Sequence, residues 1–398
     1  MRILITTDCY IPMINGVVTS VLNLESELIK LGHDVRILCP SQNISCSDDG
    51  RVYRIGSISA GRIYKGARVA LRIRQGNLKK IIDWKPDIIH SQSEFTSFIM
   101  AKKIAREVGC PIVHTYHTMY EDYTYYFSPS VAIGRDLVMK FTRRVLKHAE
   151  TVIVPSHKIQ RLLTNYGITQ SIKVVPTGLN LKKFYLENGK KNAEHLKSEL
   201  GIDAGKKVFI TVGRAAKEKN IEELIVYFKR LNIENTVFVI VGGGPYINTL
   251  KILAEKEGLK ERIIFTGAVK HEKIAEYYRL GDIFVSASQS ETQGLTYIEA
   301  LASSLPAVCK KDACLEGIIV NGKNGGQYTD FNSFKKWIEM LLGDKDLYDS
   351  MAENAADSVK CYSSEKFALD IERIYEDTIE KHKEYGSYIE YKKHSVNF

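Results

Sequence analysis

The chain has 398 residues, of which 44% are apolar and 26% charged, with a formal net charge of +9. This length predicts two domains, and this composition excludes an intrinsically disordered chain. The seven cysteines are scattered without CxxC or Cys/His spacing, so we expect them to be reduced and expect neither a disulfide framework nor a zinc site.

The N-terminus combines one Arg, a very short apolar run and an early acid, Asp8. This pattern predicts neither a signal peptide nor a membrane-spanning helix, so we expect a cytoplasmic protein. The positive charge lies in the first half, where residues 1–180 hold 24 Lys and Arg against 14 Asp and Glu, while residues 181–398 hold 32 against 33. Between Arg51 and Ile82 there are nine basic residues and no acid, which indicates a patch attractive to polyanions or an anionic membrane.

Short apolar segments alternate with helical periodicity along both halves, which predicts an α/β fold with parallel sheets covered by helices on both faces. The first half has predicted strands at 2–7, 34–40, 87–92, 111–117 and 151–156 and helices at 17–31, 95–108 and 130–148. The second half has predicted strands at 207–213, 236–244, 262–269 and 282–288, with a helix from about residue 220. We therefore predict two Rossmann-like domains, 1–178 and 179–374, joined by a linker within 174–184, and expect ligands at the loops that follow the strands.

Two glutamates eight residues apart, Glu291 and Glu299, follow the last of these strands in SETQGLTYIEALASS. The first would lie in the loop and the second inside a helix that begins near Gly294, a spacing suited to the two ends of an extended ligand. Between them the backbone N–H groups of Gly294 and Leu295 would form a helix N-terminus able to seat a phosphate. An acidic helix cap beside a solvated glutamate is the alternative interpretation.

A pair of cations, Arg214 and Lys219, follows the strand at 207–213 and would neutralise a diphosphate, unless both are solvated surface cations. The glycine turn around Gly243 would let a base or ribose approach the backbone, although an ordinary tight turn also explains it.

In the first half, Gly16 begins a helix and would let a phosphate approach the backbone. The loop that begins at residue 117 carries four side chains that could hydrogen-bond a polyol: His117, Tyr120, Asp122 and Tyr123. His117 would lie beside the sugar. His90, at the end of another strand, is a weaker candidate.

The centre of the basic segment has helical periodicity, with cations along one face and apolar residues beside them. This pattern predicts an amphipathic helix that docks peripherally on an anionic membrane; a solvated basic helix is the alternative. The cations are Lys65, Arg68, Arg72 and Lys79, and the apolar residues are Ile63, Ala67, Ala70, Leu71, Leu78 and Ile81.

The order of these motifs resembles glycosyltransferase family 4, the retaining transferases of the GT-B fold. The resemblance rests on Gly16, His117, Arg214, Lys219, Glu291 and Glu299. It implies two Rossmann-like domains facing across a cleft and a C-terminal helix within 363–386 that crosses back, so that about 375–398 belongs to the N-terminal domain. It also implies that Glu291 binds the donor sugar, Glu299 the ribose, Arg214 and Lys219 the diphosphate, and His117 the sugar near the reacting carbon, with Gly16, Gly243, Gly294 and Leu295 lining the donor.

Three stretches, GVVTSVLNL, HTMYEDYTYY and ETQGLTYIEALA, are similar to those of bacterial 1,2-diacylglycerol 3-glucosyltransferases. This narrower resemblance implies UDP-glucose as donor, a diacylglycerol acceptor contacted by Tyr120 and Tyr123, and a peripheral location on the inner face of the cell membrane. A family 4 transferase acting on a mannosyl lipid or a soluble sugar is the alternative.

We expect no metal and no other cofactor, because the DxD at Asp344 to Asp346 lies between two predicted helices, where capping explains it. A nicotinamide dehydrogenase is disfavoured because the first strand does not lead into G-x-G-x-x-G. Nucleic-acid binding lacks any accompanying signature.

Overall fold

The structure of the protein is a computed structural model that describes residues 1–398 apart from 14, 60–67, 71–74, 122–129, 186–188 and 396–398. Contacts divide the chain into two compact units: an N-terminal unit of residues 1–179 with 364–398, and a C-terminal unit of residues 180–363. The sequence predicts a linker within 174–184 and a domain boundary at 178/179, and the division between the two units lies at 179/180. The return segment begins at Ser364, earlier than the 375 assigned from the sequence.

The described part of the N-terminal unit contains an eight-stranded sheet in the order β10-β9-β8-β7-β1-β2-β4-β3. All neighbours pair in parallel except β3 with β4. The strands are β1 (Arg2–Thr6), β2 (Asp34–Pro40), β3 (Ser47–Asp48), β4 (Val52–Ile55), β7 (Ile88–Ser91), β8 (Ile112–Thr115), β9 (Thr151–Val154) and β10 (Ser171–Val174). The central strands do not alternate between apolar and polar residues, because both faces of these strands are buried.

Helices cover both faces of this sheet, as the α/β pattern predicts. One apolar cluster joins one face to side chains of α2 (Gln75–Trp84), α3 (Thr96–Val108), α4 (Val131–Leu146) and α5 (His157–Asn165). The other cluster joins the opposite face to α1 (Gly16–Lys30) and α13 (Ser364–Ser395). The predicted strands and helices of this half are therefore confirmed, with boundaries shifted by one or two residues.

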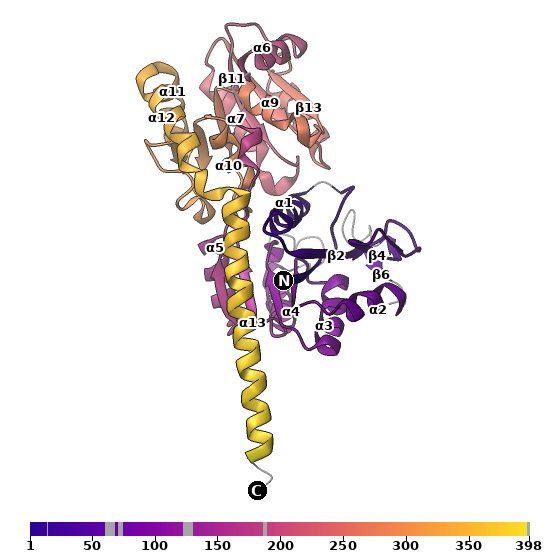
Figure 1. The fold of residues 1–398 in the computed structure, drawn as a ribbon. Coiled ribbons are helices and arrows are strands. Elements are labelled where there is room, and N and C mark those ends of the chain that lie inside the picture. The colour runs from indigo at the N-terminus through magenta and orange to yellow at the C-terminus, as the bar shows by residue number, and fades with distance from the viewer. Residues whose placement is uncertain (14, 60–67, 71–74, 122–129, 186–188, 396–398) are drawn as a thin grey trace. The chain divides into compact units, whose positions relative to one another are not determined.

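The long C-terminal helix α13 packs against α1 in the N-terminal unit (Figure 1). Phe367, Ile371 and Tyr375 are buried in the shared cluster. His33, at the end of the α1–β2 turn, bonds Glu372 through Nε2 at 2.8 Å. The first part of α13, as far as Tyr375, is thus an integral part of the N-terminal core.

The described residues of the C-terminal unit form a six-stranded parallel sheet in the order β13-β12-β11-β14-β15-β16. Its strands are β11 (Lys207–Val212), β12 (Thr236–Val241), β13 (Ile263–Gly267), β14 (Ile283–Ser286), β15 (Ala307–Lys310) and β16 (Gly325–Tyr328). Its α-helices are α6 (Gly189–Glu199), α7 (Ile221–Leu231), α8 (Ile247–Lys256), α9 (Ile274–Leu280), α10 (Leu295–Ala302), α11 (Phe331–Gly343) and α12 (Lys345–Ser358). The α/β class and the second parallel sheet are confirmed.

The predicted amphipathic membrane helix is wrong where the structure describes it. Arg68 lies in β6 (Arg68–Ala70), which pairs antiparallel with β5 (Ser57–Ser59), and its guanidinium donates to Ser57 Oγ at 2.6 Å and Ser57 O at 2.9 Å. Lys79 lies in α2, but the apolar Leu78 and Ile81 beside it are buried in the core. Core packing thus takes the two described apolar side chains of the face assigned to the membrane. Lys65 and Arg72 lie outside the described residues.

Burial of Ile371 predicts that α13 stabilises the N-terminal unit. Ile371→Ala should lower the free energy of unfolding of that unit by about 2–5 kcal/mol, because it leaves a cavity in a fully buried position. Urea unfolding followed by Trp84 fluorescence in a Trp337→Phe background measures this loss. Leu369→Ala, at a position 39% exposed on the same helix, is the matched control, and equal losses in both variants would contradict the packing described.

Candidate active site

The strand order places two loops of the C-terminal unit side by side. The sheet continues from β11 through β12 to β13 in one direction and from β14 through β15 to β16 in the other, so β11 and β14 flank the point where the order reverses. Ligands of open parallel sheets bind at the carboxyl ends of the strands at such a point. The loop after β11 carries Arg214 and Lys219, and the loop after β14 carries Glu291.

The structure brings Lys219 and Glu291 into direct contact, 72 residues apart in sequence. Lys219 Nζ donates to Glu291 Oε1 at 2.5 Å, with side-chain exposures of 26% and 18%. Ser290 Oγ donates to Glu218 O at 3.3 Å and ties the same two loops together. The cation predicted for a diphosphate and the carboxylate predicted for a sugar therefore form one half-buried ion pair.

Helix α10 begins as predicted, at Leu295 after Gly294. Gly294 has φ +80°, and a Cβ there would meet the ring of Tyr297 at 2.2 Å, so the position requires glycine. No side chain caps this helix, and the first N–H groups of a helix have no partner within it. The N-terminus of α10 is therefore suited to an anion, as the sequence indicated.

Glu299 lies one turn further along α10 and is buried. Burial raises the pKa of its carboxyl to about 7, opposed by the hydrogen bond that Tyr278 OH donates to Oε2 at 2.7 Å and by nearby Lys183. The same burial raises the pKa of Tyr278 well above its usual value. Tyr278, on α9, has no distinctive sequence signal and was missed. The alternative of a solvated helix glutamate is excluded for Glu299.

The turn at Gly243 packs against the protein's own backbone. A Cβ on Gly242 would lie 1.9 Å from Gly213 O, one on Gly244 would lie 2.2 Å from Ala215 O, and one on Gly243 would meet Ala268 at 3.3 Å. The three glycines are therefore explained by close packing between the loops after β11, β12 and β13, which leaves little or no room for a side chain. A donor contact at Gly243 stays a prediction. Arg214, half-buried beside this turn, also keeps its role as a prediction.

The N-terminal unit has its own reversal of strand order, between β1 and β7. Asp8, in the loop after β1, accepts from Ser97 N at 2.9 Å and from Phe95 N at 3.3 Å at the start of α3. Burial raises the pKa of this carboxyl to about 6, and Glu94 contributes to the rise while the bonds from Ser97 oppose it. The loop after β1 is thus fixed to the start of α3.

His117 lies in the loop after β8 and contacts the loop after β7. Its Nε2 lies 2.7 Å from Oε1 of Gln92, which is buried. Desolvation lowers the pKa of His117 to about 4, helped by His114 and opposed by Glu94. The imidazole is therefore neutral near pH 7. With Gln92 Oε1 as acceptor, Nε2 carries the proton and Nδ1 remains an acceptor for a hydroxyl.

Buried Glu94 joins the same cluster from the loop after β7. It accepts from Tyr120 OH at 2.5 Å and lies 3.4 Å from His114 Nε2. Gln92 Nε2 and His114 Nδ1 are buried without a hydrogen-bond partner among the described residues. Sequence reasoning missed Asp8, Gln92 and Glu94. Asp8 directly follows the predicted strand 2–7, Gln92 ends the predicted strand 87–92 and Glu94 follows it, so the rule that ligands bind at the carboxyl ends of strands would have selected all three.

His90 bonds Tyr375 OH through Nδ1 and Thr115 Oγ1 through Nε2, both at 2.6 Å, so it ties β7 to α13 and β8. Gly16 is the first residue of α1, as predicted, and the Asn15 side chain caps that helix by accepting from Val18 N at 2.9 Å. Asp122 and Tyr123 lie outside the described residues.

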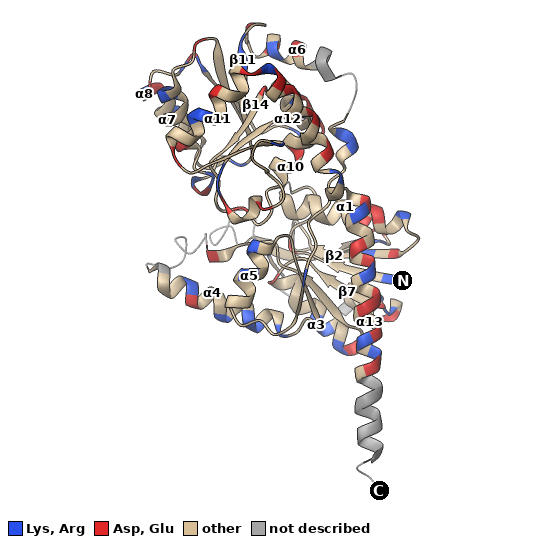
Figure 2. Ribbon diagram, turned by 90° about the vertical axis from the view of Figure 1, so that its left-hand side faces the viewer, with Lys and Arg blue, Asp and Glu red and all other residues tan. Residues whose placement is uncertain are grey.

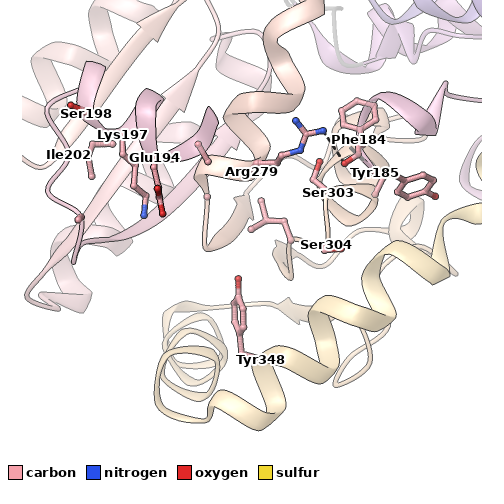
Figure 3. A pocket seen from close by; sticks show the side chains of 15 residues that line it. Phe184, Tyr185, Glu194, Lys197, Ser198, Ile202, Arg279, Ser303, Ser304 and Tyr348 are labelled. Atoms are coloured by element: carbon pink, nitrogen blue, oxygen red, sulfur yellow. Dashed lines mark hydrogen bonds between the residues drawn. The ribbon is translucent and has the colours of Figure 1, made fainter. Parts of the chain in front are cut away.

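A cavity of about 850 Å³ lies elsewhere in the C-terminal unit (Figure 3). Gly281 and Leu305, which line it, precede β14 and β15, so it opens at the amino ends of the strands, away from the Lys219–Glu291 pair. Arg279 donates to Lys183 O at 2.9 Å beside it. We do not assign the predicted chemistry to this cavity.

Asp344 of the DxD accepts from Leu347 N at 2.9 Å and caps α12, as predicted. No cluster of three side chains suited to a metal occurs among the residues that the structure describes. Among the same residues, none of the helices has both the length and the apolar character to span a bilayer.

Comparisons with known proteins decide the family. Residues 14–183 match the sequence profile "Glycosyltransferase Family 4", and residues 192–358 match "Glycosyl transferases group 1". The chain is 36% identical to an alpha-monoglucosyldiacylglycerol synthase of Streptococcus pneumoniae, over 95% of this chain and 86% of that protein. An alpha-monoglucosyldiacylglycerol synthase of Acholeplasma laidlawii is 33% identical, over 96% of this chain and 98% of that protein. The chain is a family 4 glycosyltransferase.

Solved structures confirm the GT-B fold of this glycosyltransferase. Sucrose-phosphate synthase from Thermosynechococcus elongatus superimposes with a TM-score of 0.74 at 21% identity, over 94% of this chain and 98% of that one. Anabaena HepE in complex with UDP and glucose gives a TM-score of 0.74 at 16% identity, over 95% and 100%. At these identities the likeness establishes the architecture alone.

The contact with Gln92 generates a prediction for this glycosyltransferase. Because the folded pKa of His117 is about 4 and the unfolded value about 6.5, only the unfolded chain takes up this proton between those values. His117 therefore destabilises the fold increasingly as pH falls from about 6.5 toward 4. Histidine NMR should show no titration of His117 between pH 5 and 8.

In Gln92→Glu, the new carboxylate should move the titration of His117 upward by favouring the imidazolium. Gln160→Glu is the matched control, because it makes the same change beside another histidine: Gln160 Oε1 contacts the exposed His157 at 3.0 Å. This control should leave the titration of His117 unchanged. A His117 that titrates near 6.5 in the unmodified protein would contradict this assignment.

Proposed function

We propose that the protein is a retaining hexosyltransferase that moves glucose from UDP-glucose to 1,2-diacylglycerol and forms an α-glucosyl diacylglycerol. The observation that carries the donor half is the Lys219–Glu291 pair at the reversal of strand order, with the N-terminus of α10 and buried Glu299 beside it. The two synthases at 36% and 33% identity, matched over nearly the whole chain, support the sugar and the acceptor.

In this proposal the donor extends along α10. The diphosphate lies at the N-terminus of α10 with Lys219 and Arg214, Glu299 accepts from the ribose hydroxyls, and Glu291 accepts from the sugar hydroxyls. Donor binding exchanges the half-buried Lys219–Glu291 contact for two others: ammonium to phosphate and carboxylate to sugar. Both groups avoid an unpaired buried charge in either state.

Departure of the nucleotide places positive charge at the anomeric carbon and negative charge on the leaving phosphate oxygen. Lys219, Arg214 and the dipole of α10 stabilise the oxygen, which is the role of a divalent ion in metal-dependent transferases. The departing phosphate takes the acceptor proton on the same face, so the configuration is retained without a protein base. Neutral His117, with Nδ1 as an acceptor, binds a donor-sugar hydroxyl near the reacting carbon.

The glutamate assignments predict different defects in the two variants. At pH 8, above the pKa of about 7 of Glu299, Glu299→Ala should weaken UDP binding by about 1.5–3 kcal/mol, or roughly 10- to 150-fold, because the ribose loses a charged acceptor. Glu291→Ala should mainly lower transfer, because its partner is the sugar. Calorimetry with UDP and a transfer assay measure the two effects. Glu255→Ala on exposed α8 is the control, and unchanged UDP binding and turnover in both active-site variants would refute the assignment.

The reaction itself is tested by purified protein, UDP-glucose and diacylglycerol in detergent micelles, with the product identified by mass and its anomeric configuration by NMR. We expect α-glucosyl diacylglycerol in the presence and absence of EDTA, since protein cations neutralise the diphosphate. Transfer abolished by EDTA and restored by Mg²⁺ or Mn²⁺ would overturn metal independence. Transfer only from GDP-mannose, or only to soluble sugars, would overturn the donor or the acceptor.

A further inference from the structure

Four large apolar side chains reach solvent on neighbouring segments of the N-terminal unit. They are Phe95, at the N-cap of α3, Ile99 one turn later, and Ile133 and Leu137 on α4, with exposures of 50%, 56%, 59% and 51%. We call these four residues the α3–α4 stripe. An exposed cluster of this kind marks an interaction surface, whereas a single exposed apolar residue does not.

Ring contacts join the two halves of the stripe. Phe141 lies one turn after Leu137, and its ring stacks on that of Phe95 with centroids 5.6 Å apart. Ile133, Leu137 and Phe141 recur at intervals of four, so they lie along one side of α4. The Phe95–Phe141 contact therefore connects the start of α3 with the side of α4 that carries Ile133 and Leu137.

Cations accompany the stripe along α4. Lys140 and Arg144 follow Leu137 at intervals of three and seven, which places them on the same exposed side of the helix. The basic residues of α4 and its C-cap are Arg135, Lys140, Arg143, Arg144 and Lys147, against one acid, Asp136. The ribbon of α4 is accordingly blue, the colour of Lys and Arg, at several places along its length in Figure 2.

Some of these cations have protein partners and others extend the basic surface. Lys140 pairs with Asp136 at 2.7 Å, Arg135 with Glu121 at 3.7 Å, and Arg143 Nε donates to Tyr166 O. Even after these pairs, cations predominate on α4. Apolar side chains at solvent with cations beside them complement the interface of an anionic phospholipid bilayer, where the chains insert and the cations meet phosphates.

The stripe also leads to the polar cluster described above. The Tyr120 ring lies 5.9 Å from that of Phe95 and 6.4 Å from that of Phe141, and its hydroxyl bonds Glu94. Glu94 acts electrostatically on His117. An amphipathic acceptor resting on the stripe would thus have its polar end directed to the residues assigned to the sugar.

We propose that the α3–α4 stripe and the cations of α4 form the surface that docks the N-terminal unit on an anionic phospholipid bilayer and guides the lipid acceptor toward Tyr120 and His117. The acceptor part rests on the proposed function; the docking part stands on the exposed side chains and charges. This surface replaces the helix assigned to the basic segment 51–82, because Leu78 and Ile81 of that helix are buried. The same segment also exposes Ile58 and Val69 on the β5–β6 pair, at 42% and 45%, less than any of the four residues of the stripe.

Cosedimentation with vesicles tests the docking surface directly. The vesicles contain phosphatidylcholine alone or equal parts of phosphatidylcholine and phosphatidylglycerol. Ile133→Ser/Leu137→Ser should weaken binding to the anionic vesicles roughly tenfold or more. Lys140→Glu/Arg144→Glu should weaken it at least about 25-fold, since each cation near such a surface contributes roughly fivefold, and salt should release the unmodified protein.

Matched controls lie on the C-terminal unit. Ile252→Ser replaces an apolar residue 67% exposed on α8, and Lys256→Glu/Lys260→Glu makes the same change of charge at exposed positions. Both should sediment like the unmodified protein. All variants should keep their thermal unfolding midpoint and their affinity for UDP, because the residues assigned to the donor lie in the C-terminal unit.

Unchanged vesicle binding in both α4 variants, or an equal loss in the controls, would overturn the proposal. A loss confined to Lys79→Glu/Lys80→Glu would also overturn it and would favour the basic segment. If the unmodified protein transferred no glucose to diacylglycerol, the proposed function would fail, while vesicle binding would still decide the docking surface.

Discussion

The ion pair between Lys219 and Glu291 exists because β11 and β14 are neighbours in the sheet. Parallel strands direct their carboxyl ends to one edge, and only at a reversal of strand order do two adjacent loops diverge to opposite faces and leave room for a ligand. In the C-terminal unit this constraint collects a cation, a carboxylate and a helix N-terminus from segments distant in sequence. The donor assignment depends on that arrangement.

The same constraint acts in the N-terminal unit with different side chains. The loops after β1, β7 and β8 bring together Asp8, Gln92, Glu94 and His117. Burial raises the pKa of Asp8 and lowers the pKa of His117, and both shifts favour the neutral form of the side chain. Neutral hydrogen-bonding groups suit hydroxyls, whereas the C-terminal unit presents cations that suit phosphates. The two units thus suit different ligand groups because different residue types occupy the loops at the carboxyl ends of their strands.

Much of this organisation could be predicted from the sequence, because buried parallel strands are continuous apolar runs and the residues that follow them are easily identified. Gly294, Glu291 and Glu299 were located in this way, as was the start of α1 at Gly16. Pairings between loops could not be predicted: nothing in the sequence connects Tyr278 to Glu299 or Gln92 to His117. Periodicity failed around Arg68, where cations at helical spacing fit a helix but backbone pairing with β5 produced a strand.

Two basic surfaces of the N-terminal unit illustrate why charge alone is a poor guide to a lipid-binding surface. Segment 51–82 is the most basic part of the sequence, yet Leu78 and Ile81 of its helix α2 pack inward and its exposed Ile58 and Val69 lie on the β5–β6 pair, at 42% and 45%. By contrast, α4 and the start of α3 combine cations with four apolar side chains exposed at 50–59%. Tertiary packing decides whether the apolar side chains beside a row of cations are exposed. This exposure distinguishes a basic helix that only faces solvent from the surface that we propose binds lipid.

A crystal structure of the protein with bound UDP-glucose tests the central claim most directly. The account predicts the diphosphate at the N-terminus of α10, the ribose on Glu299, and a Lys219–Glu291 pair opened so that Lys219 contacts phosphate and Glu291 contacts the sugar. A nucleotide bound at the amino ends of the strands, in the cavity lined by Arg279 and Tyr348, with the Lys219–Glu291 pair intact, would contradict it.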